Sequence, residues 1–433
     1  MDTITINKNQ PSNSPAGVSS PARYHLTVAF IICFISIMFS GIASMLMSVY
    51  LPVAVKDLLG NVTGEKMNNV GAYINSVFIF GSMFGGFAWG FICDKTGRSK
   101  AVILSTALYG LFTVLTAFSS SWLMVGIYRF MTGFGVGGVI VTTNILIAEL
   151  WPEKKRAVAL GIVSAAMPVG FIVAGAMNNL LPNWHNAFLI GIVPLATVVI
   201  ALFTLPESGT WKLNKQISAT NANFSNKLFA PGYKKNLFTG SVIFGAMLIG
   251  LWAVFSWAPT WIQSITGNDA KAKDLRGLTM MILAISGLGG SIVSGWIANA
   301  IGLRKTMIMC FAACFIMTFV VFKLNAAVSS ATFIEMGILA FFFGISQGAL
   351  SVYIPHLFPT VIRASATGFC FNIGRLFTAT VVFFIGALVI FLGGYGNAVF
   401  IFSFIFLIGL ATTYFSKDQT EAEVAALNTS FAD

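Results

Sequence analysis

The sequence predicts an all-α integral membrane protein whose twelve transmembrane helices form two pseudo-symmetric six-helix bundles. Three observations lead to this fold class: an extreme composition, apolar runs of spanning length, and motifs that occur once in each half. The chain of 433 residues is 57% hydrophobic and only 9% charged, with a mean hydropathy of +0.85. Because soluble domains contain about 25% charged residues, a soluble core does not account for this composition.

The predicted spans are apolar runs without charged residues. A helix needs about 20 apolar residues to cross the roughly 30 Å of a bilayer's hydrocarbon core. Two runs, 157–206 and 376–416, are long enough for two helices each, and they break at the segments Asn178–Asn186 and Gly393–Asn397. With these runs divided, the chain contains twelve spans. The undivided runs are 26–55, 67–93, 101–128, 130–148, 236–268, 277–303, 306–322 and 336–362.

Basic residues predict the orientation of these spans. The net charge is +11, with 25 Lys and Arg residues. If the N-terminus is cytoplasmic, 17 of them fall in the tails and the even-numbered turns, and only six fall on the opposite side. This asymmetry follows the positive-inside rule, so we expect a multi-pass protein of the plasma (inner) membrane with both termini in the cytoplasm. Since basic residues set the topology, their excess does not indicate nucleic-acid binding.

A polar segment between the sixth and seventh spans predicts two halves. The polar ends of the chain are expected to be disordered tails. The expected parts are a disordered cytoplasmic tail at 1–24, an N-terminal six-helix bundle at 25–206, a cytoplasmic central loop at 207–235, a C-terminal six-helix bundle at 236–416 and a cytoplasmic tail at 417–433.

Internal similarity indicates that the halves are duplicates. Glu149–Gly161 aligns with His356–Gly368 at a constant offset of 207, and the charged turn Gly90–Lys100 has a degraded copy at Gly295–Lys305. Each copy contains an even number of spans, so the halves share one orientation. Parallel halves related by an axis along the membrane normal define a transporter architecture with its substrate site between the halves near the midplane.

Several motifs resemble the major facilitator superfamily over about residues 25–416. The resemblance is closest to the aromatic-acid, sialic-acid, organic-anion and sugar porter branches. It implies the major facilitator fold and transport by alternating access. The segments that carry it are Gly90–Lys100, Arg129–Gly133, Glu149–Arg156, Pro206–Ser208 and His356–Arg375.

The resemblance implies that the charged turn is a conformational switch. Gly90, Asp94, Gly97 and Arg98 would form it, with Asp94 pairing with the facing half near Arg363 in the outward-open state. The alternative is a turn that only sets topology, with Asp94 as a helix cap. Asn299 replaces the acid in the second copy, so the two turns are not equivalent.

A second group of charges lies at the cytoplasmic mouth. Glu149 and Arg156 flank a proline-containing turn, and His356 and Arg363 hold the matching positions in the second half. We expect these four residues to form a gate network, unless they only satisfy helix ends. Glu149 and His356 are candidates for proton coupling. Arg129, which resembles a coupling arginine of proton-driven relatives, is the third candidate, although it could instead satisfy backbone carbonyls.

Arg375 is the strongest candidate for substrate binding. It lies roughly 18 Å along a helix of about 43 Å, near the bilayer midplane, where an arginine costs about 2.5–3.5 kcal/mol on insertion scales. No span carries a carboxylate at comparable depth. A guanidinium binds a carboxylate through two parallel hydrogen bonds, so a substrate anion is the expected counter-ion. The alternative is that Asn372, Gln347 or backbone carbonyls hold this arginine.

Aromatic and amide side chains are candidates for the rest of the site. Trp252 and Phe255 precede Pro259 in the seventh span, where they would line a cavity or belong to an interfacial aromatic belt. Asn75, Asn144, Gln347 and Asn372 lie within spans. They would complete the substrate site or form bonds between helices.

Together these features predict a secondary transporter of a small organic anion, a carboxylate metabolite, coupled to protons. A neutral sugar or polyol porter is the alternative, favoured by Pro206–Ser208, and a non-transporting sensor is a third hypothesis. We expect a monomer in the lipid bilayer with no enzymatic activity and no cofactor. We also expect no metal, since the five cysteines indicate packing residues rather than ligands. The first span carries no acid, which leaves symport, uniport and exchange open.

Overall fold

The computed structural model describes residues 23–60, 64–209, 211, 231–267, 270–358 and 363–416. Within these ranges, twelve helices are long and apolar enough to cross a membrane, and no residue is in a strand. The predicted fold class and number of spans are therefore confirmed. The predicted tails lie almost entirely outside the described residues, as does most of the central loop.

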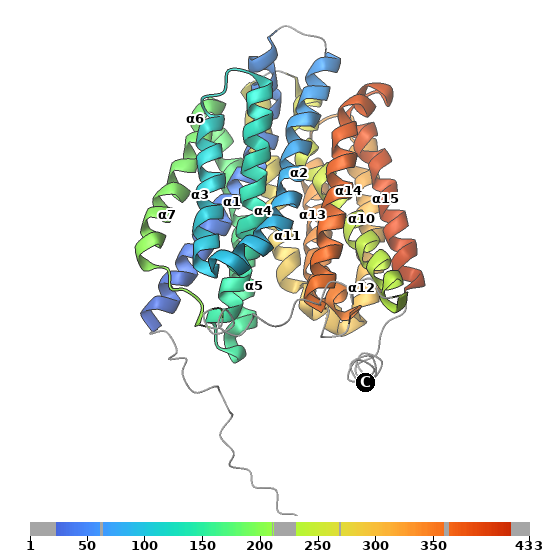
Figure 1. The fold of residues 1–433 in the computed structure, drawn as a ribbon. Helices are drawn as coiled ribbons and strands as arrows, with labels where there is room; N and C mark the ends of the chain where they lie inside the picture. Colours follow the sequence, from blue (N-terminus) through green and yellow to red (C-terminus); the bar gives the residue numbers. More distant parts are fainter. Residues whose placement is uncertain are drawn as a thin grey trace, which may run out of the picture.

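The N-terminal half contains six spans, the last of which is built from two helices joined by a short 3-10 turn. Its elements are α1 (Arg23–Leu59), α2 (Gly64–Thr96), α3 (Arg98–Thr116), α4 (Trp122–Leu150), α5 (Glu153–Leu180), α6 (Trp184–Phe188), η1 (Leu189–Gly191) and α7 (Ile192–Thr204). In Figure 1 these helices, coloured blue to green, lie on the left.

The C-terminal half contains the other six spans and lies on the right in Figure 1. Both ends of the described chain, at the start of α1 and the end of α15, lie at the bottom of that view. The elements are α10 (Pro231–Thr266), α11 (Ala270–Ile301), α12 (Leu303–Phe319), the π-helical turn η2 (Val320–Leu324), α13 (Ser330–His356), α14 (Arg363–Phe391) and α15 (Tyr395–Phe415).

Glycines with positive φ occur at equivalent backbone positions in the two halves. Gly97 and Gly302 (φ 109° and 89°) stand directly before α3 and α12 in the two copies of the charged turn. Gly60 and Gly267 (φ 65° and 87°) stand just past α1 and α10. Only glycine adopts such φ values without strain, so these four positions end or begin equivalent helices in both halves.

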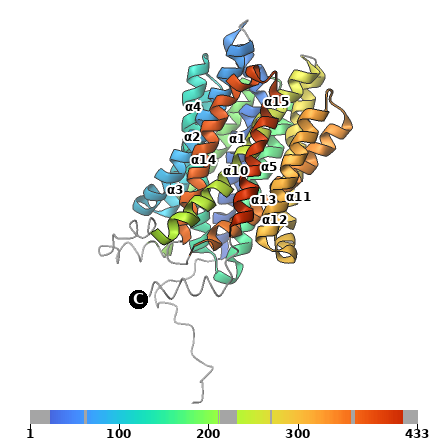
Figure 2. The same cartoon turned by 90° about the vertical axis from the view of Figure 1, so that its right-hand side faces the viewer.

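The halves meet chiefly along two helix pairs, α2 with α14 and α5 with α11, and α1 also contacts α10. Figures 1 and 2 both show α14 beside α2. We call the end of the bundle that carries Arg98, Arg156 and Arg304 the basic end. On α5 and α11, a Cβ atom at Gly175 would lie 2.7 Å from the Gly277 carbonyl oxygen. These glycines therefore let the two backbones touch at the opposite end.

The same helix pairs separate toward the basic end. Gly86 and Gly90 share one face of α2, one turn apart. A Cβ atom at Gly86 would contact α14, whereas one at Gly90 would have no neighbour within 4 Å. Gly161 on α5 and Gly295 on α11 are equally open. The described halves are thus closed against each other at the opposite end and apart at the basic end.

Candidate functional site

Arg375 lies on α14 at the interface between the halves. Its Nη1 donates a hydrogen bond of 3.3 Å to Oδ1 of Asn372, and Nδ2 of Asn372 donates to the Gly368 carbonyl oxygen at 3.0 Å. Three ion pairs occur among the described residues, and none of them includes Arg375. The predicted arginine therefore has a neutral amide partner and no carboxylate partner within the described part of the chain.

Glycines bring the neighbouring helices against this arginine. A Cβ atom at Gly86 of α2 would lie 2.7 Å from Oδ1 of Asn372 and 3.0 Å from Nη1 of Arg375. On α10, Gly245 approaches Gly374, where a Cβ atom would lie 3.2 Å from the Gly245 Cα. Small residues permit this close approach of membrane helices, so at the level of Arg375 the helix α14 packs between α2 of one half and α10 of the other.

The two candidate aromatic residues contact the N-terminal half. The ring centroid of Trp252 lies 6.2 Å from that of Phe78 on α2, and that of Phe255 lies 5.9 Å from that of Phe171 on α5. Both pairs are within the range of favourable ring contacts. Trp252 and Phe255 therefore line the interface between the halves, as a cavity role requires and an outer aromatic belt does not.

The other candidate amides, Asn75, Asn144 and Gln347, do not bond to Arg375 among the described contacts. Nδ2 of Asn75 and Nε2 of Gln347 are buried without a hydrogen-bond acceptor in the described part of the chain. Asn144 is half-buried, with no described hydrogen bond from its side chain. Because a buried donor without an acceptor is costly, Asn75 and Gln347 are suited to receive acceptor atoms of a ligand or ordered water.

Arg129 is anchored inside the N-terminal half. This residue is 1% exposed. Its side chain donates hydrogen bonds to the carbonyl oxygens of Ala43 (2.6 Å) and Ser44 (3.2 Å) on α1. Its guanidinium carbon lies 4.1 Å from the ring centroid of Phe78. Backbone carbonyls and a cation–π contact thus hold this residue, which is the structural alternative considered for it from the sequence.

The charged turn forms a network within the N-terminal half. Nε of Arg98 donates to Glu149 at 3.0 Å, and Nη1 of Arg98 donates to Asp94 at 2.9 Å. Oε2 of Glu149 also accepts a hydrogen bond from the Ser208 hydroxyl. Glu149 therefore pairs with Arg98 rather than with Arg156, whose described hydrogen bond is a long one of 3.5 Å to the Trp151 carbonyl.

The Pro206–Ser208 motif supplies the cap of α3, a role that the sequence reasoning missed. Oε1 of Glu207 accepts hydrogen bonds from the backbone N–H groups of Arg98 (2.8 Å), Ser99 (3.1 Å) and Ser208 (3.0 Å). Gly97 precedes α3 and has no side chain that could cap it. The signal was present in the sequence, since a glycine before a helix leaves its first N–H groups without a local acceptor.

The remaining gate candidates are not joined across the halves. The Asp94 side chain is 71% exposed and its described side-chain contact is with Arg98 of the same half. His356 is exposed, and its Nδ1 faces the Val352 carbonyl oxygen at 2.6 Å on its own helix. The side chain of Arg363, the expected partner of Asp94, lies outside the described part. Gly90 has open space beside it, so no described segment packs against it in this conformation.

Polar contacts at the opposite end were not predicted from the sequence. The Tyr395 hydroxyl on α15 donates to Oδ1 of Asn68 on α2. Nζ of Lys273 on α11 donates to the Asn179 carbonyl oxygen at 2.9 Å, and Nδ2 of Asn178 donates to the Lys273 carbonyl oxygen at 2.6 Å. These contacts join the halves opposite the basic end.

Two duplicated six-helix halves around a half-buried arginine at their interface, closed at one end and open at the other, define a membrane transporter. The sequence profile of the Major Facilitator Superfamily matches residues 30–379. The chain belongs to this superfamily, as the motifs predicted.

Curated relatives include transporters of several acids. The chain is 28% identical over 363 residues to a cis,cis-muconate transport protein of Acinetobacter baylyi, covering 81% of this chain and 84% of that one. It is 24% identical to the 4-hydroxybenzoate transporter PcaK of the same organism, covering 85% and 86%. It is 25% identical to the sialic acid transporter NanX of Escherichia coli, covering 70% and 73%.

Solved structures share the fold. The inward open conformation of the xylose transporter XylE from Escherichia coli superposes with a TM-score of 0.78 at 16% identity, covering 94% of this chain and 99% of that one. A bacterial homologue of the human lysosomal transporter Spinster, inward-facing, superposes with a TM-score of 0.73 at 15% identity, covering 91% and 97%. At these identities the likeness concerns the fold alone.

Proposed function

We propose that this protein is a secondary transporter of small organic anions that carry a carboxylate, and that Arg375 binds that carboxylate. The observation that carries the proposal is the position of Arg375 between the halves, with no carboxylate partner among the described residues. An arginine inside a membrane protein faces a cavity or a partner. Its planar guanidinium group can bind both oxygens of a carboxylate.

The relatives support the same substrate class. Muconate, 4-hydroxybenzoate and sialic acid, which appear in the names of three relatives, all carry a carboxylate. The aromatic rings of Trp252 and Phe255 at the interface suit a planar organic acid. Transport, rather than catalysis, is the proposed activity.

Alternating access follows from the two interfaces. With the basic end in the cytoplasm, as the positive-inside rule favours, the conformation described is open inward and closed outward. The halves would rock about the Arg375 region, exchanging the contacts at Tyr395 and Lys273 for contacts at the basic end near Asp94 and His356. Proton coupling, through Glu149, His356 or Arg129, and a monomeric state remain part of the proposal.

The test is uptake by the purified protein in liposomes. We expect uptake of labelled cis,cis-muconate or 4-hydroxybenzoate. The uptake rate should fall severely in Arg375→Gln and partially in Arg375→Lys, which keeps the charge but lacks the planar guanidinium group. Lys305→Gln, which removes an exposed cation at the basic end, is the matched control. Anion uptake at the wild-type rate by Arg375→Gln would contradict the proposal.

A sugar porter is the second candidate, because the Pro206–Ser208 motif is shared with sugar porters and is built into the Arg98 network. The same liposomes decide between the two. Uptake of D-xylose that is insensitive to Arg375→Gln, without uptake of either acid, would favour the sugar porter. A proton flux that accompanies anion uptake tests symport.

A further inference from the structure

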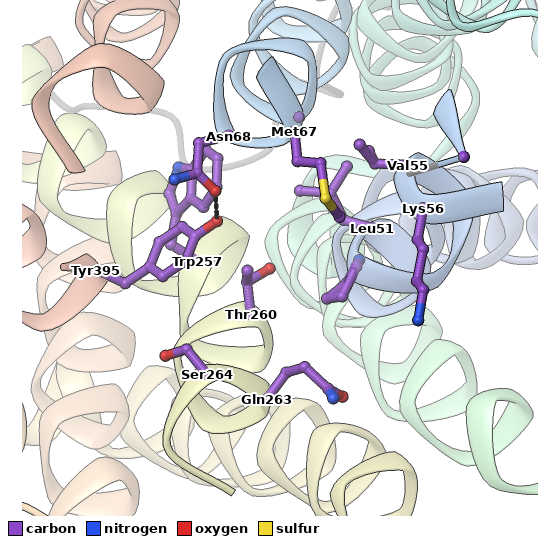
Figure 3. Close-up of a pocket in the computed structure, with 13 residues that line it drawn as sticks. Leu51, Val55, Lys56, Met67, Asn68, Trp257, Thr260, Gln263, Ser264 and Tyr395 are labelled. Atoms are coloured by element: carbon purple, nitrogen blue, oxygen red, sulfur yellow. Dashed lines mark hydrogen bonds between the residues drawn. The ribbon is translucent and has the colours of Figure 1, made fainter. Parts of the chain in front are cut away.

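We propose that the pocket at the opposite end of the bundle is a second binding site for a small carboxylate, separate from the Arg375 site. The pocket has a volume of about 300 Å³ and lies between α1, α2, α10 and α15 (Figure 3). Its walls include Lys56, Asn68, Trp257, Thr260 and Tyr395. This volume accommodates one small organic acid.

The pocket is distant from Arg375. Asn68 lines the pocket and Gly86 touches Arg375, and both belong to α2. Eighteen residues of helix separate them, which is about 27 Å at 1.5 Å per residue. One small ligand cannot span this distance, so the pocket is not an extension of the proposed central site.

The local charge is positive. Lys56 lines the pocket. Arg276 is only 4% exposed and donates a hydrogen bond to Oε1 of Gln263 on the pocket wall. Neither cation has an ion-pair partner among the described residues, and no acidic residue lines the pocket. The neighbouring Asp57 is engaged by Trp184 and His185. Topology does not explain these cations, because the positive-inside rule disfavours basic residues at this end.

Buried donors on the wall lack acceptors. Oγ1 of Thr260 and Nε1 of Trp257 are buried without a hydrogen-bond partner in the described part of the chain, in residues 6% and 0% exposed. Figure 3 shows the Thr260 hydroxyl turned toward the space between α10 and Leu51. Unsatisfied buried donors carry a free-energy cost, which an incoming oxygen atom would remove. A carboxylate supplies such oxygens together with the negative charge that the two cations favour.

The pocket adjoins the contact that closes this end. Tyr395 stacks on Trp257 with ring centroids 5.4 Å apart, and its hydroxyl donates to Oδ1 of Asn68. A carboxylate beside Asn68 would compete for the Tyr395 hydroxyl. We therefore assign the pocket a capture role: it holds the anion at the closed entrance and weakens the bond that keeps the halves together.

The experiment is equilibrium binding of labelled cis,cis-muconate to the full chain in lipid nanodiscs. The Arg375→Gln background removes the proposed central site. We expect this background to keep a weaker binding component. Adding Lys56→Gln should weaken that component about two- to fivefold, as for an exposed charge pair, and adding Thr260→Val about three- to tenfold, as for one hydrogen bond. Lys305→Gln and Thr380→Val, each at an exposed position, are matched controls and should change nothing.

Two results would overturn the proposal. One is complete loss of muconate binding in Arg375→Gln protein that remains folded, and the other is a residual component that neither Lys56→Gln nor Thr260→Val weakens. A separate readout uses the wild-type background, where Lys56→Gln and Thr260→Val should raise the KM of uptake and leave kcat unchanged. Unchanged KM in both variants also counts against the capture site, while leaving the role of Arg375 intact.

Discussion

The hydroxyl of Tyr395 on α15 donates a hydrogen bond to Oδ1 of Asn68 on α2, and so joins the two halves at the end opposite the basic end. Lys273 and Asn179 form a second bridge between α11 and α5. The first bridge is a neutral hydrogen bond, the second joins a lysine ammonium to a backbone carbonyl, and neither is an ion pair. Since a neutral hydrogen bond contributes about 0.5–1.5 kcal/mol net and one to a charged group about 1.5–3 kcal/mol, this closure can be broken in each transport cycle.

Replacing Tyr395 by phenylalanine should shift the protein toward the conformation that is open at this end. The ring still stacks on Trp257, and only the bond to Asn68 is lost. The expected shift in the population ratio is about two- to twelvefold. Distance measurements between spin labels on α2 and α15 report this ratio.

Tyr414→Phe is the control for this change, because Tyr414 is 57% exposed. Asn68→Ala should resemble Tyr395→Phe, and the double variant should add little to either. Independent, additive shifts from the two substitutions would show that the bond does not hold the halves together.

Gly86→Ala should displace Arg375. The new Cβ atom would lie 2.7 Å from Oδ1 of Asn372 and 3.0 Å from Nη1 of Arg375, so the ends of these two side chains have to move away from α2. Inserting a methyl group into a packed interface costs about 1–3 kcal/mol. Uptake of muconate should fall by more than tenfold, and the thermal midpoint should fall as well.

The matched control is Gly126→Ala on α4, where a Cβ atom has no neighbour within 4 Å. Alanine favours a helix over glycine by about 1 kcal/mol, so this variant should be as stable as the wild type or more stable. Equal uptake by the Gly86 and Gly126 variants would mean that the α2–α14 approach does not position Arg375.

The fold was predictable because its signals are strong and local. Spans follow from apolar runs, and the duplication follows from matching motifs such as the two charged turns. In the structure, Gly97 and Gly302 in these turns both have a positive φ angle. The isolation of Arg375 from carboxylates was also predictable, because no acid occurs at that depth in the sequence. Each of these inferences depends on where residues lie in the sequence and does not require knowing which distant residues contact each other.

The pairings themselves were not predictable. Glu149 bonds to Arg98, 51 residues away, although Arg156 is nearer in sequence. The predicted span 277–303 begins just after Arg276, whereas α11 begins at Ala270, so Arg276 lies inside the helix and bonds to Gln263. Such contacts depend on how helices pack, which the periodicity of one sequence does not define.

Glu207→Ala should destabilise the start of α3. The substitution removes the oxygen that accepts the backbone N–H groups of Arg98, Ser99 and Ser208. Loss of a helix cap costs about 1–2 kcal/mol, measured as the free energy of unfolding in mixed micelles. Glu207→Gln keeps an acceptor and should cost less. Asp274→Ala, at an exposed position on α11, is the control. If Asp274→Ala lowered the free energy of unfolding as much as Glu207→Ala, the effect could not be attributed to the helix cap.

Arg129→Lys should lower stability although it keeps the charge. Arg129 reaches the carbonyl oxygens of Ala43 and Ser44 with two nitrogens of one planar group and lies over the Phe78 ring, and a lysine ammonium does not reproduce this geometry. Hydrogen bonds to charged groups contribute about 1.5–3 kcal/mol each, so the loss should be of that order in mixed micelles. Lys305→Gln should leave stability unchanged. If Arg129→Lys unfolds as the wild type does while the proton flux that accompanies uptake is lost, Arg129 acts in coupling and its anchoring contacts do not stabilise the fold.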